Sequence, residues 1–471
     1  MADSYEPLSN LDAAILGLED KTNLMMIAGL LTFSRPIDVA RLKNLLTERW
    51  LSQRRMRQRV VRPDLLLARA YWEDDPVFNL NAHVRRIALP APGDRQVLQE
   101  VASDLVSMPL DYSKPLWQFH VIDNYGAGGA LLLRIHHAIA DGLALAELMR
   151  HLCDDQPQVA QWTAPPTPGA NGQIPETTIE LGRQLGLAAY FGRRLARRLV
   201  ITGLDVLSDP EKGRQLLDRG AAQAQSALQL ALKVTENDVV AEQSLSVRKQ
   251  VAWAHPIPLP QIKELQKVLG GTLNDLMVTA LVGGLRRYLL ANDQPVNGVR
   301  FRAAIPVNLR PEQDSARLGN QFGVVLLAMP LAMANPEERL AEVRARMDAL
   351  KQSPEAVTSY RLISALGFAP PEVVQVLVRQ FSTLASAVIT NVPGPETERY
   401  LAGEKIEEVM FWAPHAGRVG LAVSIYSFAG KVNVGVLSDA RGMVEPGAFI
   451  AHFEAEFAAM VALADGRSHE T

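Results

Sequence analysis

The residue pattern with the clearest chemical potential is a pair of histidines, His136 and His137, followed after three residues by Asp141 and Gly142. Imidazole has an ordinary pKa near neutrality, so a histidine can accept the proton of a hydroxyl nucleophile. A structural alternative stays open, in which the segment is a strand-turn-helix junction with two hydrogen-bonded histidines. Asp141 would then be a helix N-cap, and Gly142 a turn residue with permissive backbone angles.

The motif lies between a predicted strand and a predicted helix. An apolar run over residues 130–133 precedes it, and a helical pattern over residues 143–152 follows it. Because successive strand residues point to opposite faces, we expect only one histidine to face a substrate channel. The same alternation makes it difficult for the two imidazoles to bind one metal ion, and no His-Glu-x-x-His helix occurs, so no metal site is expected.

Other catalytic motifs are missing from the sequence. It contains neither a Gly-x-Ser-x-Gly elbow nor a Walker-type phosphate loop. Gly126 to Gly129 lack the third glycine of a dinucleotide fingerprint, and a tight turn between two strands explains them better. The single cysteine, Cys153, excludes an intrachain disulfide and suits a reducing compartment. We interpret it as a small buried residue rather than a nucleophile.

Length and composition are those of a folded protein with two or three domains. The chain has 471 residues, of which 48% are hydrophobic and 21% charged, and its net charge of −3 gives no basic bias toward nucleic acid. No secretory signal is visible at the start. The longest apolar run, residues 324–334, is well short of the roughly 20 residues that span a bilayer. These features predict a cytosolic protein.

Helix and strand patterns recur on both sides of a segment rich in proline and glycine. We expect strands at residues 25–33, 119–123, 130–135, 248–254, 299–305, 322–329, 387–390, 420–427 and 431–438. We expect helices at residues 39–49, 95–105, 143–152, 260–269, 273–290 and 336–352. The predicted fold is α/β (α+β), with an N-terminal lobe (1–155), a linker and helical connector (156–245) and a C-terminal lobe (246–471).

The connector carries a cluster of four arginines. Arg193, Arg194, Arg197 and Arg198 fall at i, i+1, i+4 and i+5, so on a helix they share one face. One interpretation is an interfacial helix that rests on anionic lipid. The other is a solvated basic face whose apolar side packs on a domain.

His-His-x-x-x-Asp-Gly is identified as the signature of the CoA-dependent acyltransferase superfamily. Five further blocks, in order from about Leu8 to Asp439, resemble those of bacterial wax ester synthase/diacylglycerol acyltransferases. The blocks are Leu8-Ser9 to Asp12, Pro109-Leu110-Asp111 with Pro115-Leu116-Trp117, Asn274-Asp275, Pro306-Val307-Asn308-Leu309-Arg310 with Gly319-Asn320, and Asn391-Val392-Pro393-Gly394-Pro395.

The resemblance implies two chloramphenicol-acetyltransferase-like lobes, each a mixed sheet flanked by helices, with a tunnel at their interface. It implies that His137 is a general base, which takes the acceptor proton as the oxygen attacks the acyl-CoA thioester and then protonates the CoA thiolate. No acyl-enzyme and no cofactor are expected, because acyl-CoA is a co-substrate. The acceptor would be diacylglycerol or a long-chain alcohol, and the product triacylglycerol or wax ester.

The resemblance also implies roles for the residues near the base. His136 would support His137, Asp141 would pair with an arginine that the sequence does not identify, and Gly142 would allow close approach of backbone or CoA. Asn274 would orient His137 or hold the oxyanion.

Two further sets of residues are candidate substrate contacts with a structural alternative. Asp275 follows Asn274 at the lobe interface, but Thr272 and Asp275 also form a helix-capping arrangement, which we favour for it. Pro115, Leu116 and Trp117 are expected to wall the acyl tunnel, a role compatible with plain packing.

The expected acceptors partition into membranes, so we expect peripheral association with the inner membrane or lipid droplets. The arginine cluster is the candidate contact. Two alternatives stay open: a condensation-type acyltransferase that uses carrier-tethered donors, and a degenerate lipid-binding protein that keeps the fold without catalysis.

Overall fold

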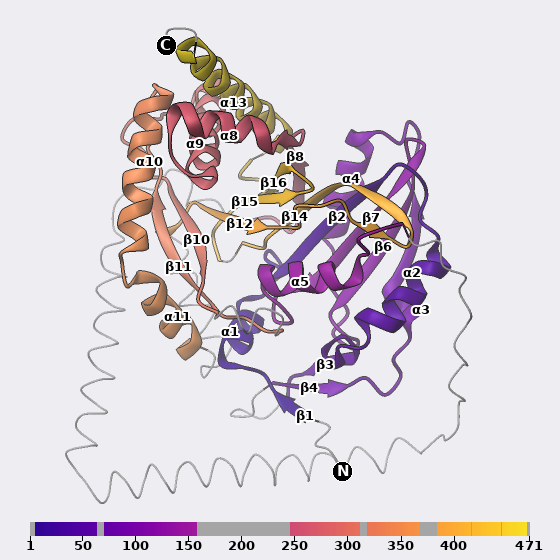
Figure 1. The fold of residues 1–471 in the computed structure, drawn as a ribbon. Helices are drawn as coiled ribbons and strands as arrows, with labels where there is room; N and C mark the ends of the chain where they lie inside the picture. The colour runs from indigo at the N-terminus through magenta and orange to yellow at the C-terminus, as the bar shows by residue number, and fades with distance from the viewer. Residues whose placement is uncertain are drawn as a thin grey trace, which may run out of the picture. The chain divides into compact units, whose positions relative to one another are not determined.

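A computed structural model of the chain describes residues 5–63, 70–157, 245–310, 318–366, 384–415, 417–443 and 445–468. Residues 1–158 and 237–471 form one compact unit, and residues 159–236 form a second. The described residues all belong to the first unit (Figure 1). The arginine cluster at 193–198 and nearly all of the predicted connector lie outside the described residues.

One large sheet has six strands in the order β13-β14-β2-β7-β6-β5. These are β2 (Met26–Phe33), β5 (Val84–Ala88), β6 (Trp117–Tyr125), β7 (Gly128–His136), β13 (Tyr400–Leu401) and β14 (Glu404–Trp412). β7 is buried at every position, as expected for a central strand covered on both faces. It forms a hairpin with β6 around Gly126, whose φ of 56° lies in the left-handed region. The predicted turn is therefore confirmed.

The elements around this sheet belong mainly to the N-terminal part of the chain. Its helices are α1 (Asn10–Leu18), α2 (Val39–Leu45, continued by a π-helical turn at Leu46–Trp50), α3 (Leu80–His83), α4 (Arg95–Val106) and α5 (Gly142–Leu152). A small sheet joins β1 (Tyr5–Pro7), β4 (Tyr71–Asp74) and β3 (Gln58–Val61).

The second large sheet has the order β11-β10-β12-β15-β16-β8, with β9 also paired to β16. Its strands are β8 (Lys249–Trp253), β9 (Ile257–Pro258), β10 (Arg302–Asn308), β11 (Phe322–Ala328), β12 (Ala387–Pro393), β15 (Leu421–Phe428) and β16 (Lys431–Asp439). The accompanying helices are α8 (Leu259–Leu269), α9 (Leu273–Ala291), α10 (Pro336–Lys351), α11 (Glu355–Leu366) and α13 (Pro446–Ser468).

Helix α9 packs closely against both α10 and α13. A Cβ added at Gly283 would lie 2.1 Å from Arg339 Nη1, and one at Gly284 would lie 2.6 Å from the Cα of Phe453. A side chain at Gly284 would collide with the backbone of α13, and one at Gly283 would displace the side chains of Arg339 and Glu456. Gly284 therefore allows α9 and α13 to approach closely.

Among the described residues, one helix, α13, has the length and composition of a membrane span, and α8 with α9 passes the same test only as a pair bent by 91°. Phe453 and Met460 of α13 are fully buried in a core that includes residues of α9. One side of α13 therefore packs in this core, and 39% of its apolar window is buried.

The two halves of the chain share a strand. β14 comes from the C-terminal half but pairs antiparallel with β2, with Phe411 opposite Gly29 and Val409 opposite Leu31 (Figure 1). The predicted mixture of sheets flanked by helices is confirmed. The pairing between β2 and β14 crosses the predicted lobe boundaries.

Candidate active site

The histidine pair lies where β7 ends. His136 is the last residue of that strand and pairs with Met26 of β2. His137 lies just beyond it and donates its backbone N–H to the carbonyl oxygen of Met25 at 2.8 Å. The side chain of His136 is buried, at 1% exposure, whereas His137 is half-buried. The two imidazoles thus have different surroundings, as the alternation of strand residues predicts.

His136 is built into the turn as a neutral ring. The Ala138 N–H donates to its Nδ1 at 3.1 Å, so the proton of the neutral ring lies on Nε2. That nitrogen is 3.9 Å from a carboxylate oxygen of Glu19, which also accepts a hydrogen bond from the hydroxyl of Tyr112. Burial lowers the pKa of His136 to about 3. The ring therefore stays uncharged near pH 7, and its bond to the Ala138 N–H supports the turn.

The side chain of Asn320 connects His137 to a buried carboxylate. Its Nδ2 donates to the carbonyl oxygen of His137 at 2.7 Å and to Oδ1 of Asp12 at 2.7 Å. Asp12 lies in the first turn of α1, where its own N–H donates to the Ser9 hydroxyl that caps the helix. Burial raises the pKa of Asp12, and the hydrogen bond from Asn320 lowers it. Three distant segments of the chain meet at this amide.

The surroundings of His137 suit a base near neutral pH. Burial lowers the pKa of its ring below 6.5, while the Asp141 carboxylate, the carbonyl of His137 itself, Asn320 and Asp12 act to raise it. The ring of Phe322 lies 5.6 Å away, measured between ring centres. A lowered pKa keeps the imidazole in the neutral form that accepts a proton.

Asp141 joins the motif to the C-terminal half of the chain. Its Oδ1 accepts the Ala144 N–H at 2.9 Å and so caps α5, as the sequence predicts. Its Oδ2 accepts a hydrogen bond from Arg310 Nη2 at 2.8 Å and another from the Gln321 N–H at 3.2 Å. The Arg310 and Asp141 side chains are only 4% and 9% exposed. Arg310 is therefore the partner that the sequence left unidentified.

Gly142 is the first residue of α5, and its φ is not in the left-handed region. The prediction that permissive backbone angles explain this glycine is therefore wrong. The reason is space, because an added Cβ would lie 3.3 Å from Cγ2 of Val392.

Asn274 and Asp275 begin helix α9 and have different contacts. Asp275 is buried and forms a capping box with Thr272, since its Oδ2 accepts from the backbone N–H and the hydroxyl of Thr272, each at 2.8 Å. This is its favoured structural role. Asn274 accepts a hydrogen bond from Asn391 at 3.3 Å. The structure shows no hydrogen bond between Asn274 and His137 in the described parts of the chain, so the catalytic role of Asn274 stays a prediction.

Leu116 and Trp117 are core residues of the N-terminal part of the chain. Trp117 stacks on His83 with ring centres 4.3 Å apart and donates its indole N–H to the Met56 carbonyl at 2.8 Å. The Leu116 carbonyl accepts the His136 N–H at 2.9 Å. Pro115, which precedes them, is also buried. The three residues thus support the end of β7, and none is among the described residues that line the pocket beside it.

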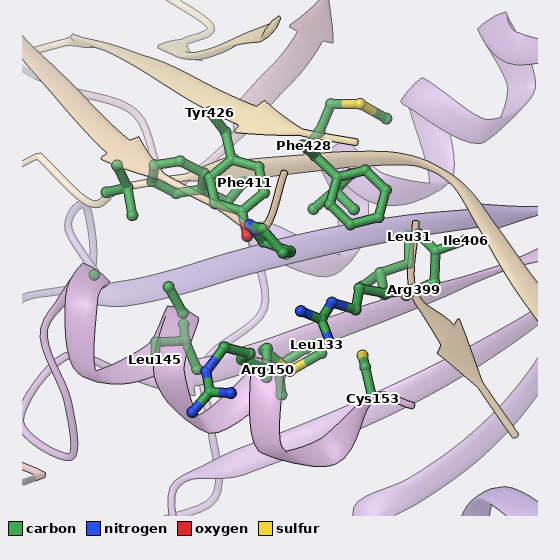
Figure 2. Close-up of a pocket in the computed structure, with 18 of the residues that line it drawn as sticks. Leu31, Leu133, Leu145, Arg150, Cys153, Arg399, Ile406, Phe411, Tyr426 and Phe428 are labelled. Atoms are coloured by element: carbon green, nitrogen blue, oxygen red, sulfur yellow. The ribbon is translucent and has the colours of Figure 1, made fainter. Parts of the chain in front are cut away.

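An apolar pocket extends from Gly142 along α5 (Figure 2). It contains about 730 Å³ of empty space, including solvent at its opening. Its α5 side is one helical stripe of Gly142, Leu145, Ala146, Met149 and Arg150, and Cys153 follows just after the helix ends. At 1.5 Å per residue the helical stripe is about 12 Å long. Figure 2 shows Phe411, Tyr426 and Phe428 across the pocket from Leu145 and Arg150.

Among the described residues, neither a cysteine thiolate nor a group of side chains that could bind a metal ion lies at this pocket. Burial raises the pKa of the Cys153 thiol to about 12, so it stays protonated near pH 7. In the described residues no group of three or more His, Cys, Asp or Glu side chains could hold a metal ion.

The wax ester synthase/diacylglycerol acyltransferase catalytic domain matches residues 8–277, and the C-terminal domain of the same family matches residues 318–461. The chain belongs to this family. It is an acyltransferase of the wax ester synthase/diacylglycerol acyltransferase type.

Relatives and solved structures agree with this assignment. A Mycobacterium tuberculosis protein named as a diacylglycerol O-acyltransferase is 30% identical over 418 residues, which cover 88% of this chain and 82% of the relative. A second one from that organism is 27% identical over 455 residues, 92% of this chain and 86% of the relative. The wax ester synthase/diacylglycerol acyltransferase of Marinobacter aquaeolei has a TM-score of 0.68 at 22% identity, covering 98% of this chain and all of the other.

The fold is also that of peptide-synthetase condensation domains. The starter condensation domain of rhizomide synthetase, solved with C8-CoA and Leu-SNAC, has a TM-score of 0.58 at 13% identity and covers 98% of this chain and 95% of the other. The two-lobed fold predicted from the sequence is confirmed by this likeness and by the Marinobacter enzyme.

Sequence reasoning missed several members of the acyltransferase site. Asp12, Arg310 and Asn320 belong to blocks that resemble the family, but nothing in their local pattern connects them to His137. Only the contacts across the fold show that all three hold the motif. The pocket residues of β14 were missed because no strand was expected at residues 404–412.

Proposed function

We propose that the protein transfers the acyl group of a long-chain acyl-CoA to the hydroxyl group of a diacylglycerol, a long-chain alcohol, or both. One observation carries the proposal. His137 is a half-buried imidazole with a lowered pKa at the end of β7, and Gly142, five residues later, opens an apolar pocket.

In the proposed reaction His137 acts twice. It is a general base while the acceptor adds to the thioester, and a general acid while the CoA thiolate leaves. Its neutral ring takes the hydroxyl proton as the acceptor oxygen bonds to the thioester carbonyl carbon. The tetrahedral intermediate then collapses, the C–S bond breaks, and the imidazolium gives its proton to the CoA thiolate. General-base catalysis of this kind contributes roughly 100- to 10,000-fold in rate.

The surrounding residues support this use of His137. The carboxylates of Asp141 and Asp12 both raise the pKa of its ring, so they stabilise the imidazolium that forms during the reaction. Asn320 and the Met25 carbonyl hold the His137 backbone at the strand end. The protonated thiol of Cys153 gives no reason to invoke an acyl-enzyme.

A thiol-release assay tests the proposal with palmitoyl-CoA as donor and hexadecanol or dioleoylglycerol as acceptor. We expect His137→Ala to lower turnover by roughly 100-fold or more while the protein still binds acyl-CoA. His151→Ala is the matched control, because His151 is an exposed histidine of α5. Full turnover by a His137→Ala variant that binds acyl-CoA normally would contradict the mechanism. Wild-type activity that needs a carrier-tethered donor would favour the condensation-type alternative.

We further propose that the enzyme acts in the cytoplasm and docks peripherally on the inner membrane or on lipid droplets. Its expected acceptors partition into lipid, and the arginines at 193, 194, 197 and 198 supply a positive charge that anionic lipid would attract. Changing these four arginines to glutamate should weaken sedimentation with anionic liposomes but not change turnover of a dispersed short-chain alcohol. Unchanged liposome binding would remove this proposal.

A further inference from the structure

Gly29 lies between apolar residues of strand β2 and lines the pocket. In the sheet it lies between Leu133 of β7 and Phe411 of β14, which are its partners on the two sides. All three residues line the pocket. A glycine inside a strand weakens the strand, because it has no side chain to pack. Pairing within the sheet therefore gives no reason for this residue.

The backbone of the protein does not require a glycine at position 29. Its φ is not in the left-handed region, and the nearest atom to an added Cβ would be the Met410 carbonyl oxygen at 3.9 Å, an ordinary contact. Gly283 and Gly284 differ, because side chains there would collide with neighbouring helices. Ile27, Gly29 and Leu31 lie on the same face of β2, and all three line the pocket. The space left by the missing side chain at Gly29 is therefore part of the pocket.

The opposite wall has a similar gap. Along the α5 stripe, Ala146 lies between the larger residues Leu145 and Met149 in the chain, and all three line the pocket. Leu148 and Leu152 are buried in the core instead. A small residue on each wall leaves an open apolar space, and the stripe of which Ala146 is part begins at the histidine motif.

We infer that the pocket holds a long linear hydrocarbon chain of a substrate, and that Gly29 and Ala146 determine the chain length it accepts. This inference rests on the proposed function. The chain could belong to the acyl donor or to the acceptor, and both present the same chemistry to apolar walls. A side chain at either position would fill space that the chain otherwise occupies, and each methylene that loses its place reduces transition-state binding.

The experiment measures kcat/KM for two substrate series. One series varies the acyl-CoA from octanoyl to palmitoyl with hexadecanol as acceptor, and the other varies the alcohol from octanol to hexadecanol with palmitoyl-CoA as donor. The variants are Gly29→Ala, Gly29→Leu and Ala146→Leu. Gly447→Leu is the matched control, because Gly447 is exposed and has no atom within 4 Å of an added Cβ. Thermal unfolding checks that each variant is folded.

We expect Gly29→Leu and Ala146→Leu to lower the long-chain to short-chain ratio of kcat/KM by about tenfold or more in one series. Gly29→Ala should give a smaller shift, and the control none. The series that responds identifies whether donor or acceptor occupies the pocket. Unchanged ratios in both series, in folded variants with wild-type turnover, would overturn the inference and leave the proposed function intact. A wild type inactive with both series would contradict the proposed function instead.

Discussion

Two carboxylates act on His137 from different parts of the chain, and each lies at the start of a helix. Asp141 follows the histidine, caps α5 and pairs with Arg310. Asp12 reaches His137 through the amide of Asn320. A buried charge is tolerated when it is paired and hydrogen-bonded, and these bonds meet that requirement. His137 is therefore held by contacts from both halves of the chain.

Replacing Asp12 by asparagine should affect the proton affinity of His137. Asp12 raises the pKa of His137, so its neutralisation lowers that pKa further. Because the neutral ring is the base, the acid limb of the profile of kcat/KM against pH should move to lower pH. The plateau rate should fall roughly tenfold, since the imidazolium loses a stabilising charge.

The comparison for this prediction is Asp38→Asn, which removes an exposed N-cap carboxylate of α2 far along the chain from the motif. That control should leave the pH profile unchanged. A purely structural role for Asp12 would lower thermal stability but leave the position of the acid limb where it is in the wild type.

Two helices begin at the candidate site, and their capped first turns fix the positions of residues there. α5 begins at the Asp141 cap and α9 at the capping box of Thr272 with Asp275. A capped first turn has fixed backbone N–H groups, so the residues next to it have fixed positions as well. Gly142 and Asn274 each occupy such a first turn.

Thr272→Ala should destabilise the protein by about 1 kcal/mol, because the Asp275 N–H loses its side-chain acceptor. Thr272→Ser keeps the hydroxyl and should stay near wild type. Thermal unfolding of the three proteins gives the comparison. An equal loss of stability in Thr272→Ala and Thr272→Ser would show that the methyl group of Thr272, and not the cap, is responsible.

Local patterns predicted most elements but not the contacts between them. The strand predicted at 130–135 and the helix predicted at 143–152 correspond to β7 and α5 within two residues at each end. The strand β14 was missed because its sequence, Glu404-Lys405-Ile406-Glu407-Glu408, begins with charged residues and is only intermittently buried. The ion pair between Asp141 and Arg310 spans 169 residues, and periodicity carries no information on such a pairing.

Neutral histidines are buried in several regions of the molecule. Burial lowers the pKa of His136 and His415 to about 3, and burial with the nearby Arg134 lowers that of His120 to about 4. Each ring is therefore uncharged in the folded protein and charged below pH 6.5 in the unfolded chain. Their stabilising contribution is complete above about pH 6.5 and is lost as the pH falls toward the folded pKa values.

Acidification from pH 6.5 to pH 4 should lower the free energy of unfolding by roughly 3 kcal/mol for each fully buried histidine. Thermal unfolding across this range measures the loss. His120→Gln should reduce the dependence on pH, since it removes one of the three groups, whereas His151→Gln at an exposed position should not. If the free energy of unfolding depended on pH equally in His120→Gln and the wild type, His120 would not be a neutral histidine in the folded protein.

The strand shared by the two halves has a consequence during synthesis on the ribosome. β2 ends at residue 33 and β14 begins at residue 404, so 370 residues emerge between them. At roughly 5–20 residues per second, the apolar edge of β2 that β14 will cover waits roughly 20–70 s without its partner. An uncovered edge of this kind is a template for intermolecular pairing. The nascent N-terminal half should therefore depend on chaperones until nearly the whole chain has been made.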